Sequence, residues 1–377
     1  MTVDTAWIDG QPATRDDALR AAADLVGRAR QPFVGGLRTD VAGLRSALSL
    51  ASQTGAIVDH RGSAAIYPLI VASREGGAFL AAPAEMRRRA DRVLILGDMA
   101  TAIGADVLRV VTEREPDLGI GTRGSDRQFM TLGSKKVASP GSLETSHVDC
   151  AGAEIVDVLG MVRAAMAGRR TSEGALGEET LATIASFLKD AAFACIVFAP
   201  AEFGDLGCEQ IFGLVADLNE TTRASTLPVV AEPDAMGAAL QATWTAGFPL
   251  RVSYGRGAAE HDETLFASER QLSGKGEADV AILVDAIFAE KTAGTAQLAM
   301  EFAIPAIMLT GDPDAAANAK IAFHVATAGR DHDGVLYDPR FGSFVAKAAQ
   351  TTSELPTAAD ILDALSEHLG ERARKAA

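Results

Sequence analysis

The feature that most constrains the fold is an alternation of helical stripes and short apolar strands at the start of the chain. Residues 14–17 place a capping threonine and two aspartates before an apolar stripe, which predicts a helix. Residues 31–37 form a short apolar strand, and Asp40 begins a second helical stripe that Gly55 ends. Residues 56–60 form the next strand. This order of helix, strand, helix and strand predicts a parallel sheet.

The same elements recur along the rest of the chain. Further strands are predicted at residues 92–98, 127–133, 195–200, 227–230, 280–284 and 306–310. Helices are predicted at residues 144–167 and 178–189, and a last helix, capped by Thr357, carries Ile361, Leu362, Leu365 and Leu369. No internal repeat is present. The fold class expected from these residues is α/β.

Composition narrows the possible functions. The chain has 377 residues, of which 48% are hydrophobic and only 5% aromatic, which suits helices packed on a parallel sheet. With 35 basic and 50 acidic residues the net charge is −15, which opposes nucleic-acid binding. No apolar run approaches the ~20 residues of a membrane span, and no signal peptide is present, so we expect a soluble, cytoplasmic protein.

Residues 218–257 contain few patterns typical of helices or strands. The segment includes Thr221-Thr222-Arg223-Ala224-Ser225-Thr226, then Trp244-Thr245-Ala246-Gly247-Phe248-Pro249, then Tyr254-Gly255-Arg256-Gly257. Glycine and proline favour turns, and polar side chains can cap the backbone groups that turns leave unpaired. Loops between regular elements often carry binding residues, so this stretch is a candidate binding region.

At these residues the chain resembles the B subunit of formylmethanofuran dehydrogenase, a branch of the molybdopterin oxidoreductases. It resembles more closely the counterpart of that subunit in the formyltransferase/hydrolase complex of methylotrophic bacteria. The resemblance runs from Ile8 to Leu369. It implies two Rossmann-like parallel-sheet domains, with residues 75–265 inserted into a discontinuous domain of residues 1–74 and 266–377.

The resemblance also identifies a position at which a metal ligand is missing. In the dehydrogenase subunits a Cys-His-Gly-Pro segment supplies the cysteine that binds tungsten or molybdenum. Aligned on Pro68, the cysteine falls on Ala65, the histidine on Ile66 and the glycine on Tyr67. A methyl group cannot replace the thiolate that a soft metal prefers. Ser63 and His60 remain as substitute ligands to consider.

The cysteine count agrees with a loss of redox chemistry. Cys150, Cys195 and Cys208 are widely spaced, and a [4Fe–4S] cluster needs four thiolates. The related B subunits begin with a cysteine-rich cluster-binding segment that this sequence does not contain. We therefore expect neither a tungsten- or molybdenum-pterin nor an iron–sulfur cluster, and a subunit that is itself catalytically inactive.

In the complex that the chain resembles, a formyl group is carried on a methanofuran-type amine with a polyglutamate tail, in tetrahydromethanopterin-linked conversion of formaldehyde to formate. The implied partners are a formyltransferase subunit, a zinc-dependent hydrolase subunit and a further small subunit. A polyanionic tail favours arginine and lysine. The predicted carrier-binding residues are Arg256, Arg223, Arg251, Arg61, Tyr67, Lys135 and Lys136. The face that meets partner chains is expected to be apolar in the lone chain.

Two alternatives stay open. One is an active tungsten- or molybdenum-pterin subunit of a formylmethanofuran dehydrogenase that uses a substitute metal ligand. The other is an unrelated nucleotide-binding enzyme, supported by the glycine turn at Gly35-Gly36 and the G-x-G-x-x-G sequence of residues 119–124. The histidines show no zinc spacing and no G-x-S-x-G elbow occurs, which disfavours zinc and serine-hydrolase sites.

Overall fold

The computed structural model describes residues 5–119, 126–135, 145–171, 174–287, 303–314 and 319–376. The chain divides into two compact units. The first unit consists of Met1–Ser63, Asp234–Tyr337 and Ser343–Ala377, and the second of Ala64–Pro233 with Asp338–Gly342. The chain thus leaves the first unit after Ser63 and returns at Asp234. From the sequence, the inserted domain was expected to begin near residue 75 and to end near residue 265.

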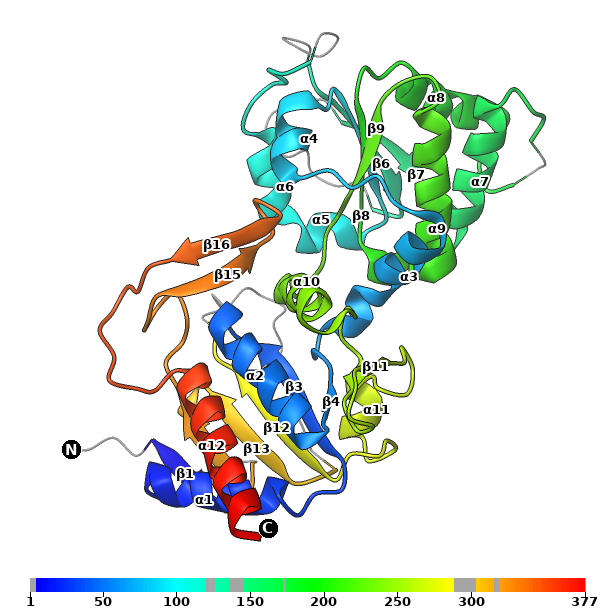
Figure 1. Ribbon diagram of the computed structural model, residues 1–377. Coiled ribbons are helices and arrows are strands. Elements are labelled where there is room, and N and C mark those ends of the chain that lie inside the picture. Colours follow the sequence, from blue (N-terminus) through cyan, green and yellow to red (C-terminus); the bar gives the residue numbers. More distant parts are fainter. Residues whose placement is uncertain are drawn as a thin grey trace. The chain divides into compact units, whose positions relative to one another are not determined.

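The first unit is built on a sheet that has nine strands among the described residues (Figure 1). Its order is β11-β10-β4-β3-β12-β13-β14-β1-β2. The central strands are parallel, namely β4 (Ile57–Val58), β3 (Pro32–Arg38), β12 (Val280–Asp285), β13 (Ala306–Thr310) and β14 (Ile321–His324). The outer strands are antiparallel, namely β1 (Ala6–Ile8), β2 (Gln11–Pro12), β10 (Val252–Ser253) and β11 (Glu260–His261).

Helices α1 (Arg15–Val26), α2 (Val41–Thr54) and α12 (Ala358–Ala376) pack beside one another in this unit. The predicted helix starts are confirmed. The Thr14 hydroxyl accepts a bond from the Asp17 N–H at 3.1 Å, and the Asp40 carboxylate accepts from the Gly43 N–H at 2.9 Å. Gly55 ends α2 with φ of 69°, the left-handed conformation that glycine adopts without steric cost.

Among its described residues, the first unit contains two further helices and a separate two-stranded sheet. They are α10 (Asp234–Ala246), α11 (Ser268–Leu272) and a two-stranded sheet of β15 (Gly334–Asp338) and β16 (Ser343–Lys347). A cluster of buried side chains, among them Phe33, Ile57 and Leu283, packs against Phe266 and Leu272 beside α11. The parallel strands are therefore apolar on this face as well, as buried parallel sheets are.

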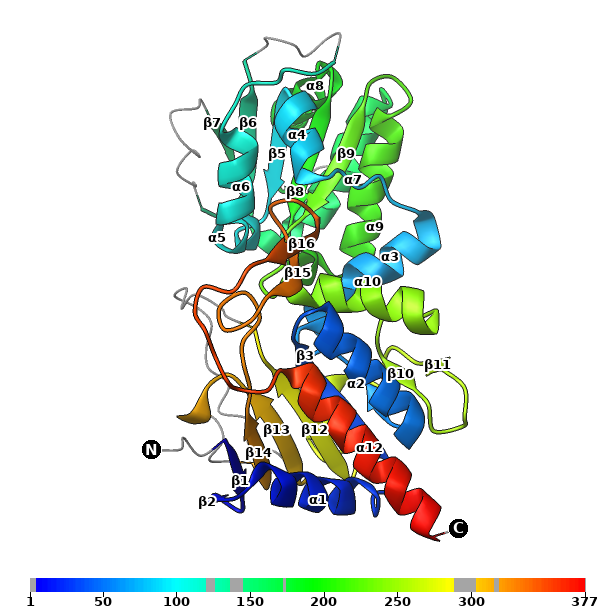
Figure 2. The same ribbon diagram turned by 60° about the vertical axis from the view of Figure 1, so that its left-hand side comes forward.

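The second unit has a sheet of order β7-β6-β5-β8-β9 whose strands are all parallel (Figure 2). They are β7 (Thr145–Asp149), β6 (Gln128–Gly133), β5 (Arg92–Leu96), β8 (Ala194–Phe198) and β9 (Ala224–Pro228). Helices α4 (Pro83–Arg89), α5 (Met99–Ile103) and α6 (Ala105–Thr112) cover one face, and α3 (Tyr67–Gly76), α7 (Ile155–Met166), α8 (Glu178–Lys189) and α9 (Pro200–Leu218) lie on the other. The fold is therefore mixed α/β with parallel sheets, as the sequence predicted.

A buried arginine joins two helices of the second unit. Arg127 is 3% exposed, and its guanidinium donates to backbone carbonyls at the ends of α4 and α6. These carbonyls have no partner inside their own helices, because the last turn of a helix leaves its carbonyl groups unpaired. Arg127 therefore supplies bonds that the two helices cannot make for themselves.

Two sequence expectations are wrong. Residues 218–257 were expected to be mostly loop apart from a strand at residues 227–230. The strand β9 starts earlier, at Ala224, and the stretch also contains the whole of α10, so Trp244 lies on a helix. Residues 144–167 were expected to be one helix, but Thr145–Asp149 is the parallel strand β7 and the α-helix begins at Ile155. For β7, pairing with β6 overrides a weak local pattern. For α10, the residues are mostly alanine, leucine, methionine and glutamine, which favour a helix, and this signal was missed.

Among the described residues, the helices are either too short or too polar to cross a lipid bilayer.

Candidate functional site

The order of the parallel strands marks one edge of the first unit as the place where folds of this class bind ligands. Numbered by appearance in that unit, β4, β3, β12, β13 and β14 follow the order 2-1-3-4-5. In such sheets ligands bind at the carboxyl ends of the two strands where the order reverses, which here are β3 and β12. Arg38 ends β3 and Asp285 ends β12. Arg38 Nη1 donates to Asp285 Oδ1 at 2.9 Å.

A network of charged side chains surrounds this pair. Arg38 Nε lies 3.2 Å from Asp234 Oδ2, and Arg61 Nη1 lies 3.4 Å from Asp285 Oδ2. Asp285 is thus shared by two guanidinium groups that come from different segments of the chain. The side chains of Arg38 and Arg61 are 11% and 15% exposed, whereas that of Asp285 is 32% exposed. The two arginines are therefore oriented by carboxylates of the protein itself.

His60 is fixed in one tautomer by its two hydrogen bonds. The Gly62 N–H donates to His60 Nδ1 at 2.8 Å, so that Nε2 carries the ring proton and donates to Asp234 Oδ2 at 3.0 Å. Burial alone would raise the pKa of Asp234, but the bond from His60 and the charge of Arg38 outweigh it and lower this pKa to about 2. His60 is fully buried. Both ring nitrogens of His60 are thus hydrogen-bonded to other groups of the protein.

A second buried carboxylate lies beside this network. Asp59 Oδ2 accepts bonds from the Ser63 hydroxyl at 2.8 Å and the Ser268 N–H at 2.7 Å, and Arg251 Nε lies 3.7 Å from it. Asp59 Oδ1 is buried and has no hydrogen-bond partner among the described residues. Burial raises the pKa of Asp59 to about 6, although Arg251, Ser63 and Ser268 each act to lower it.

In the second unit the strand order is 3-2-1-4-5 when numbered in the same way, so it reverses between β5 and β8. The carboxyl side chain of Glu202 occupies the turn at the carboxyl end of β5. Glu202, in the first turn of α9, accepts from the backbone N–H groups of Asp98 at 2.8 Å and Met99 at 3.0 Å. Gly97 has φ of 77°, and a Cβ there would lie 2.2 Å from the Glu202 carboxylate. This turn therefore already holds an anion, which disfavours binding of a nucleotide phosphate at the same place.

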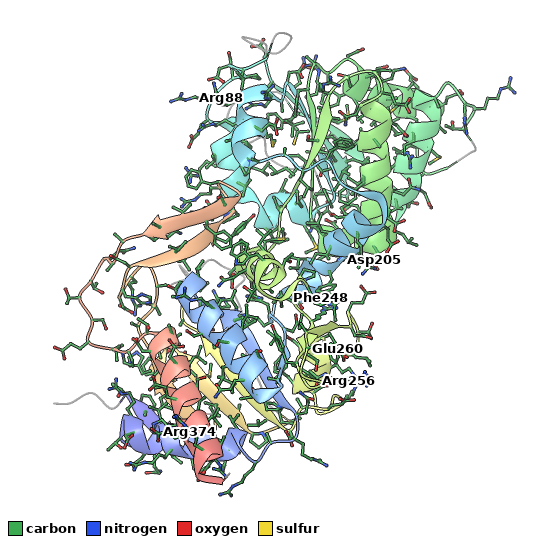
Figure 3. The ribbon with its side chains drawn as sticks, in the orientation of Figure 1. Arg88, Asp205, Phe248, Arg256, Glu260 and Arg374 are labelled. Carbon is green, nitrogen blue, oxygen red and sulfur yellow. The ribbon has the colours of Figure 1, made fainter. Side chains whose placement is uncertain are left out.

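The predicted site residues of the first unit differ in burial and in the contacts that they make. Arg61 and Arg251 both lie around the segment 59–63 of the first unit. Arg251 lies in the loop before β10 as expected, but its side chain is enclosed: it is 8% exposed and donates to Ser63 and to the Glu263 carbonyl. Unlike Arg61 and Arg251, Arg256 is exposed to solvent. Its side chain is 83% exposed, and Nη1 lies 3.5 Å from Glu260 Oε1. Figure 3 labels the two side chains beside each other.

The other predicted residues belong to the second unit. Tyr67 is buried at the start of α3, and Ala65 is half-buried at the end of the short 3-10 helix Ser63–Ala65. Arg223 precedes β9 and Lys135 follows β6, and both side chains are exposed. Since all strands of this sheet are parallel, Arg223 and Lys135 lie at opposite ends of it, about 17 Å apart along the strands. Lys136 lies outside the described residues, as do residues 120–125 of the G-x-G-x-x-G sequence.

Two hollows are formed on the surface by described residues. One, of about 550 Å³, lies in the first unit between residues of α1 and α12, and none of the described predicted residues lines it. The other, of about 270 Å³, is formed in the second unit by residues 192 and 219–223, and it includes Arg223. Arg223, a predicted binding residue, therefore lines a hollow of the second unit.

Three members of the network, Arg38, Asp234 and Asp285, were not predicted from the sequence, and Asp59 was noted only as the start of a segment. A signal for them was present. Arg38 and Asp285 each end a buried apolar strand, and Asp59 follows another. Because the carboxyl ends of parallel strands meet at one edge, polar residues in these places are expected to gather. The contribution of Asp234 could not be found in this way, since it starts a helix far away in the sequence.

Comparison with known proteins gives a consistent result. No protein-family model matches the sequence. The chain is 33% identical over 377 residues to the B subunit of the formyltransferase/hydrolase complex Fhc of Methylorubrum extorquens, an alignment that covers 97% of this chain and 98% of that protein. It also matches a chain in the crystal structure of the formyltransferase/hydrolase complex FhcABCD of Methylorubrum extorquens in complex with methylofuran. That match has a TM-score of 0.85 and 31% identity, and it covers 98% of this chain and 99% of the other.

Proposed function

The chain belongs to the family of the B subunits of formyltransferase/hydrolase complexes, and on this premise we propose that it is a non-redox subunit of such a complex that helps to hold a methylofuran-type formyl carrier. The observation that carries the proposal is the extent of the likeness. Identity of 33% over 97% of the chain, with a TM-score of 0.85 to a complex crystallised with methylofuran, leaves no large part of the fold unmatched.

The side chains around position 65 support a subunit without a metal-pterin. Ala65 has no donor atom. Of the two substitute donors, His60 has both ring nitrogens engaged, and the Ser63 hydroxyl donates to Asp59 and accepts from Arg251. The residues present at this segment therefore do not fit a tungsten or molybdenum centre.

The cysteines also support a subunit without a redox cofactor. Cys150, Cys195 and Cys208 are all buried. Burial raises the pKa of Cys150 to about 11 and that of Cys208 to about 12, and it raises the pKa of Cys195 further still. A [4Fe–4S] cluster needs four thiolates, and the sequence contains three cysteines, which supports a subunit without such a cluster.

As partners we propose a formyltransferase subunit, a zinc-dependent hydrolase subunit and a further small subunit, acting together in one-carbon metabolism. We propose that the polyanionic tail of the carrier contacts exposed cationic side chains, of which Arg256, Arg223 and Lys135 are candidates. Lys136, which lies outside the described residues, stays a candidate from the sequence. Arg61, oriented by Asp285, is a further candidate at the carboxyl edge of the first unit. Arg251 and Tyr67 are buried, and we assign them the role of supporting neighbouring segments.

We also propose that the two units are Rossmann-like domains, the second inserted in the first. The ranges of the units and their parallel sheets support this arrangement.

The proposal is tested by purifying the complex through an affinity tag on this chain. We expect formyltransferase and hydrolase subunits in the eluate, and mass spectrometry of the denatured complex to detect a furan-bearing amine with a glutamate tail. Isolation of the chain alone, or of a complex without carrier, would contradict the proposal. Tungsten or molybdenum in stoichiometric amount would favour the dehydrogenase alternative.

The carrier-binding residues are tested by the paired substitution of Arg256→Ala and Arg223→Ala. We expect turnover at limiting carrier to fall, and the apparent affinity for the carrier to become less dependent on salt, because exposed ion pairs are screened. The matched control replaces two exposed arginines of other surfaces, Arg28→Ala and Arg109→Ala, whose side chains are 74% and 62% exposed. Equal behaviour of the two double variants would remove Arg256 and Arg223 from the site.

A further inference from the structure

An exposed apolar surface on the first unit has no role in the function proposed so far. Leu240 and Trp244 on α10 are 42% and 61% exposed, and Val335 on β15 is 39% exposed. Together with Phe344 on β16 they form what we call the apolar face. Large apolar side chains that gather on a surface mark a site of interaction more often than single exposed ones do.

The members of the apolar face are in contact or adjacent. The ring centroids of Trp244 and Phe344 are 5.2 Å apart, and those of Phe344 and Tyr337 are 5.8 Å apart. Leu240 lies one helical turn before Trp244, so both side chains are on the same side of α10. Val335 is two residues before Tyr337 and therefore lies on the same face of β15. These contacts join α10 to β16, and β16 to β15, so the apolar face combines a helix with two strands that come about a hundred residues later in the chain.

Close packing holds this surface in place. A Cβ at Gly237 of α10 would lie 2.6 Å from Tyr337 Cβ, so the helix approaches β15 as closely as a glycine permits. The aromatic rings of Tyr337 and Phe344 meet edge-on at 78°, a favoured arrangement. A surface that is ordered before binding loses less conformational entropy when a partner docks.

The surrounding sequence is depleted of charge. Residues 235–250 contain no charged side chain, although 23% of the whole chain is charged and about four would be expected in 16 residues at that average. The strand segments 334–337 and 343–346 contain none either. Loss of charged residues with enrichment of tryptophan, tyrosine and phenylalanine distinguishes the centre of a protein interface from ordinary surface.

The charge of the chain indicates what kind of molecule binds there. A second copy would bring together two molecules that each carry a net charge of −15, and this repulsion opposes pairing of two identical faces. Binding of a different chain with a less acidic surface is not opposed by this electrostatic repulsion. Family members are described as subunits of a multi-chain complex, which supplies such chains.

We propose that the apolar face is the surface on which another subunit of the formyltransferase/hydrolase complex docks, with Trp244 inserted in an apolar pocket whose rim is neutral or basic. This inference rests on the proposed function, and it adds the surface and the chemistry of the partner. Tryptophan at the centre of an interface commonly dominates the binding energy.

The test uses the complex purified through a tag on this chain, with its subunits identified by mass spectrometry. Trp244→Glu and Leu240→Glu are expected to weaken capture of at least one subunit about thirty-fold or more, the effect of losing one dominant anchor. Trp244→Phe is expected to retain capture. The matched control is Leu265→Glu, since Leu265 is a 49% exposed leucine of the same unit outside the apolar face. It is expected to capture all subunits at the wild-type level.

A second measurement needs no substitution. Hydroxyl-radical oxidation of Trp244, read in the peptide of α10, is expected to be several-fold slower in the wild-type complex than in the lone chain. Unchanged oxidation on assembly, or unchanged capture by both glutamate variants, would overturn the inference while the proposed function stands. A wild-type chain that captures no subunit refutes the proposed function and this inference with it. A lone chain that dimerises in sedimentation, and no longer does so as Trp244→Glu, assigns the face to a second copy and also overturns it.

Discussion

At the scale of single residues, burial raises the pKa of Asp59, so that its carboxyl group keeps its proton to a higher pH than an ordinary aspartate does. The carboxyl group is fully buried, and only one of its oxygens is hydrogen-bonded among the described residues. Desolvation therefore outweighs the charge of Arg251, and the pKa rises to about 6. The folded state binds this proton more strongly than the unfolded chain, in which an aspartate titrates near pH 4.

This difference predicts a pH dependence of stability. Between about pH 4 and 6 the folded protein holds more protons than the unfolded chain, so the free energy of unfolding falls as the pH rises through this window. A shift of about two pKa units corresponds to about 3 kcal/mol. Urea denaturation should show this fall in the wild type and a flatter curve in Asp59→Asn. The exposed Asp106→Asn serves as control and should follow the wild type, and a parallel curve for Asp59→Asn would contradict the assignment.

Arg127 provides a second prediction at this scale. Arg127→Met removes the guanidinium that bonds the carbonyls at the ends of α4 and α6, and it leaves those buried acceptors unpaired. We expect the free energy of unfolding to fall by about 3 kcal/mol or more, because each charged bond and each unpaired group contributes on the order of 1–3 kcal/mol. Arg109→Met on the exposed face of α6 should change it by less than about 0.5 kcal/mol. Urea denaturation of both variants measures the difference, and equal midpoints would show that Arg127 does not hold the helices.

At the scale of elements, the sequence predicted most of the fold. The strand Ala306–Thr310, the helix Glu178–Lys189 and the caps at Thr14 and Asp40 are confirmed, because strong local signals and burial agree there. The strand Thr145–Asp149 was missed, since its polar sequence is stabilised by pairing with β6 rather than by local pattern.

The candidate site was harder to predict than the fold. Arg61 was found, but its carboxylate partner Asp285 lies more than two hundred residues away, and Asp234 comes from a helix that had been expected to be a loop. Arg251 looked like a loop cation in the sequence, and only the fold shows that it is enclosed beside Asp59. A single sequence reports which side chains are charged, and it does not report which opposite charges the topology brings to them.

Glu202 gives a prediction at the scale of elements, because its carboxylate joins the start of α9 to the turn after β5. Glu202→Ala leaves the N–H groups of Asp98 and Met99 without that acceptor and should lower the free energy of unfolding by about 1–3 kcal/mol. Asp205→Ala, an exposed position in the same helix, should be within about 0.5 kcal/mol of the wild type. Differential scanning calorimetry compares the two, and an unchanged Glu202→Ala would show that the turn is held by other contacts.

At the scale of the whole molecule, the second unit is almost one continuous segment with its own sheet and core. Residues 64–233 expressed alone should therefore fold and unfold cooperatively, as a domain with its own hydrophobic core does. Circular dichroism during thermal unfolding would record this, and a gradual loss of signal would contradict it. The segment 1–63 alone lacks the strands β12, β13 and β14 and should remain unfolded, which makes it the matched control.

The burial of every native cysteine has a practical consequence for following the complex in solution. Thiols that are enclosed and protonated react slowly with maleimides and iodoacetamides. A single cysteine introduced at an exposed position away from the apolar face, such as Arg28, would then be the one site of this chain that takes up a fluorophore. Assembly and carrier turnover can thus be followed by fluorescence energy transfer without first substituting the native cysteines.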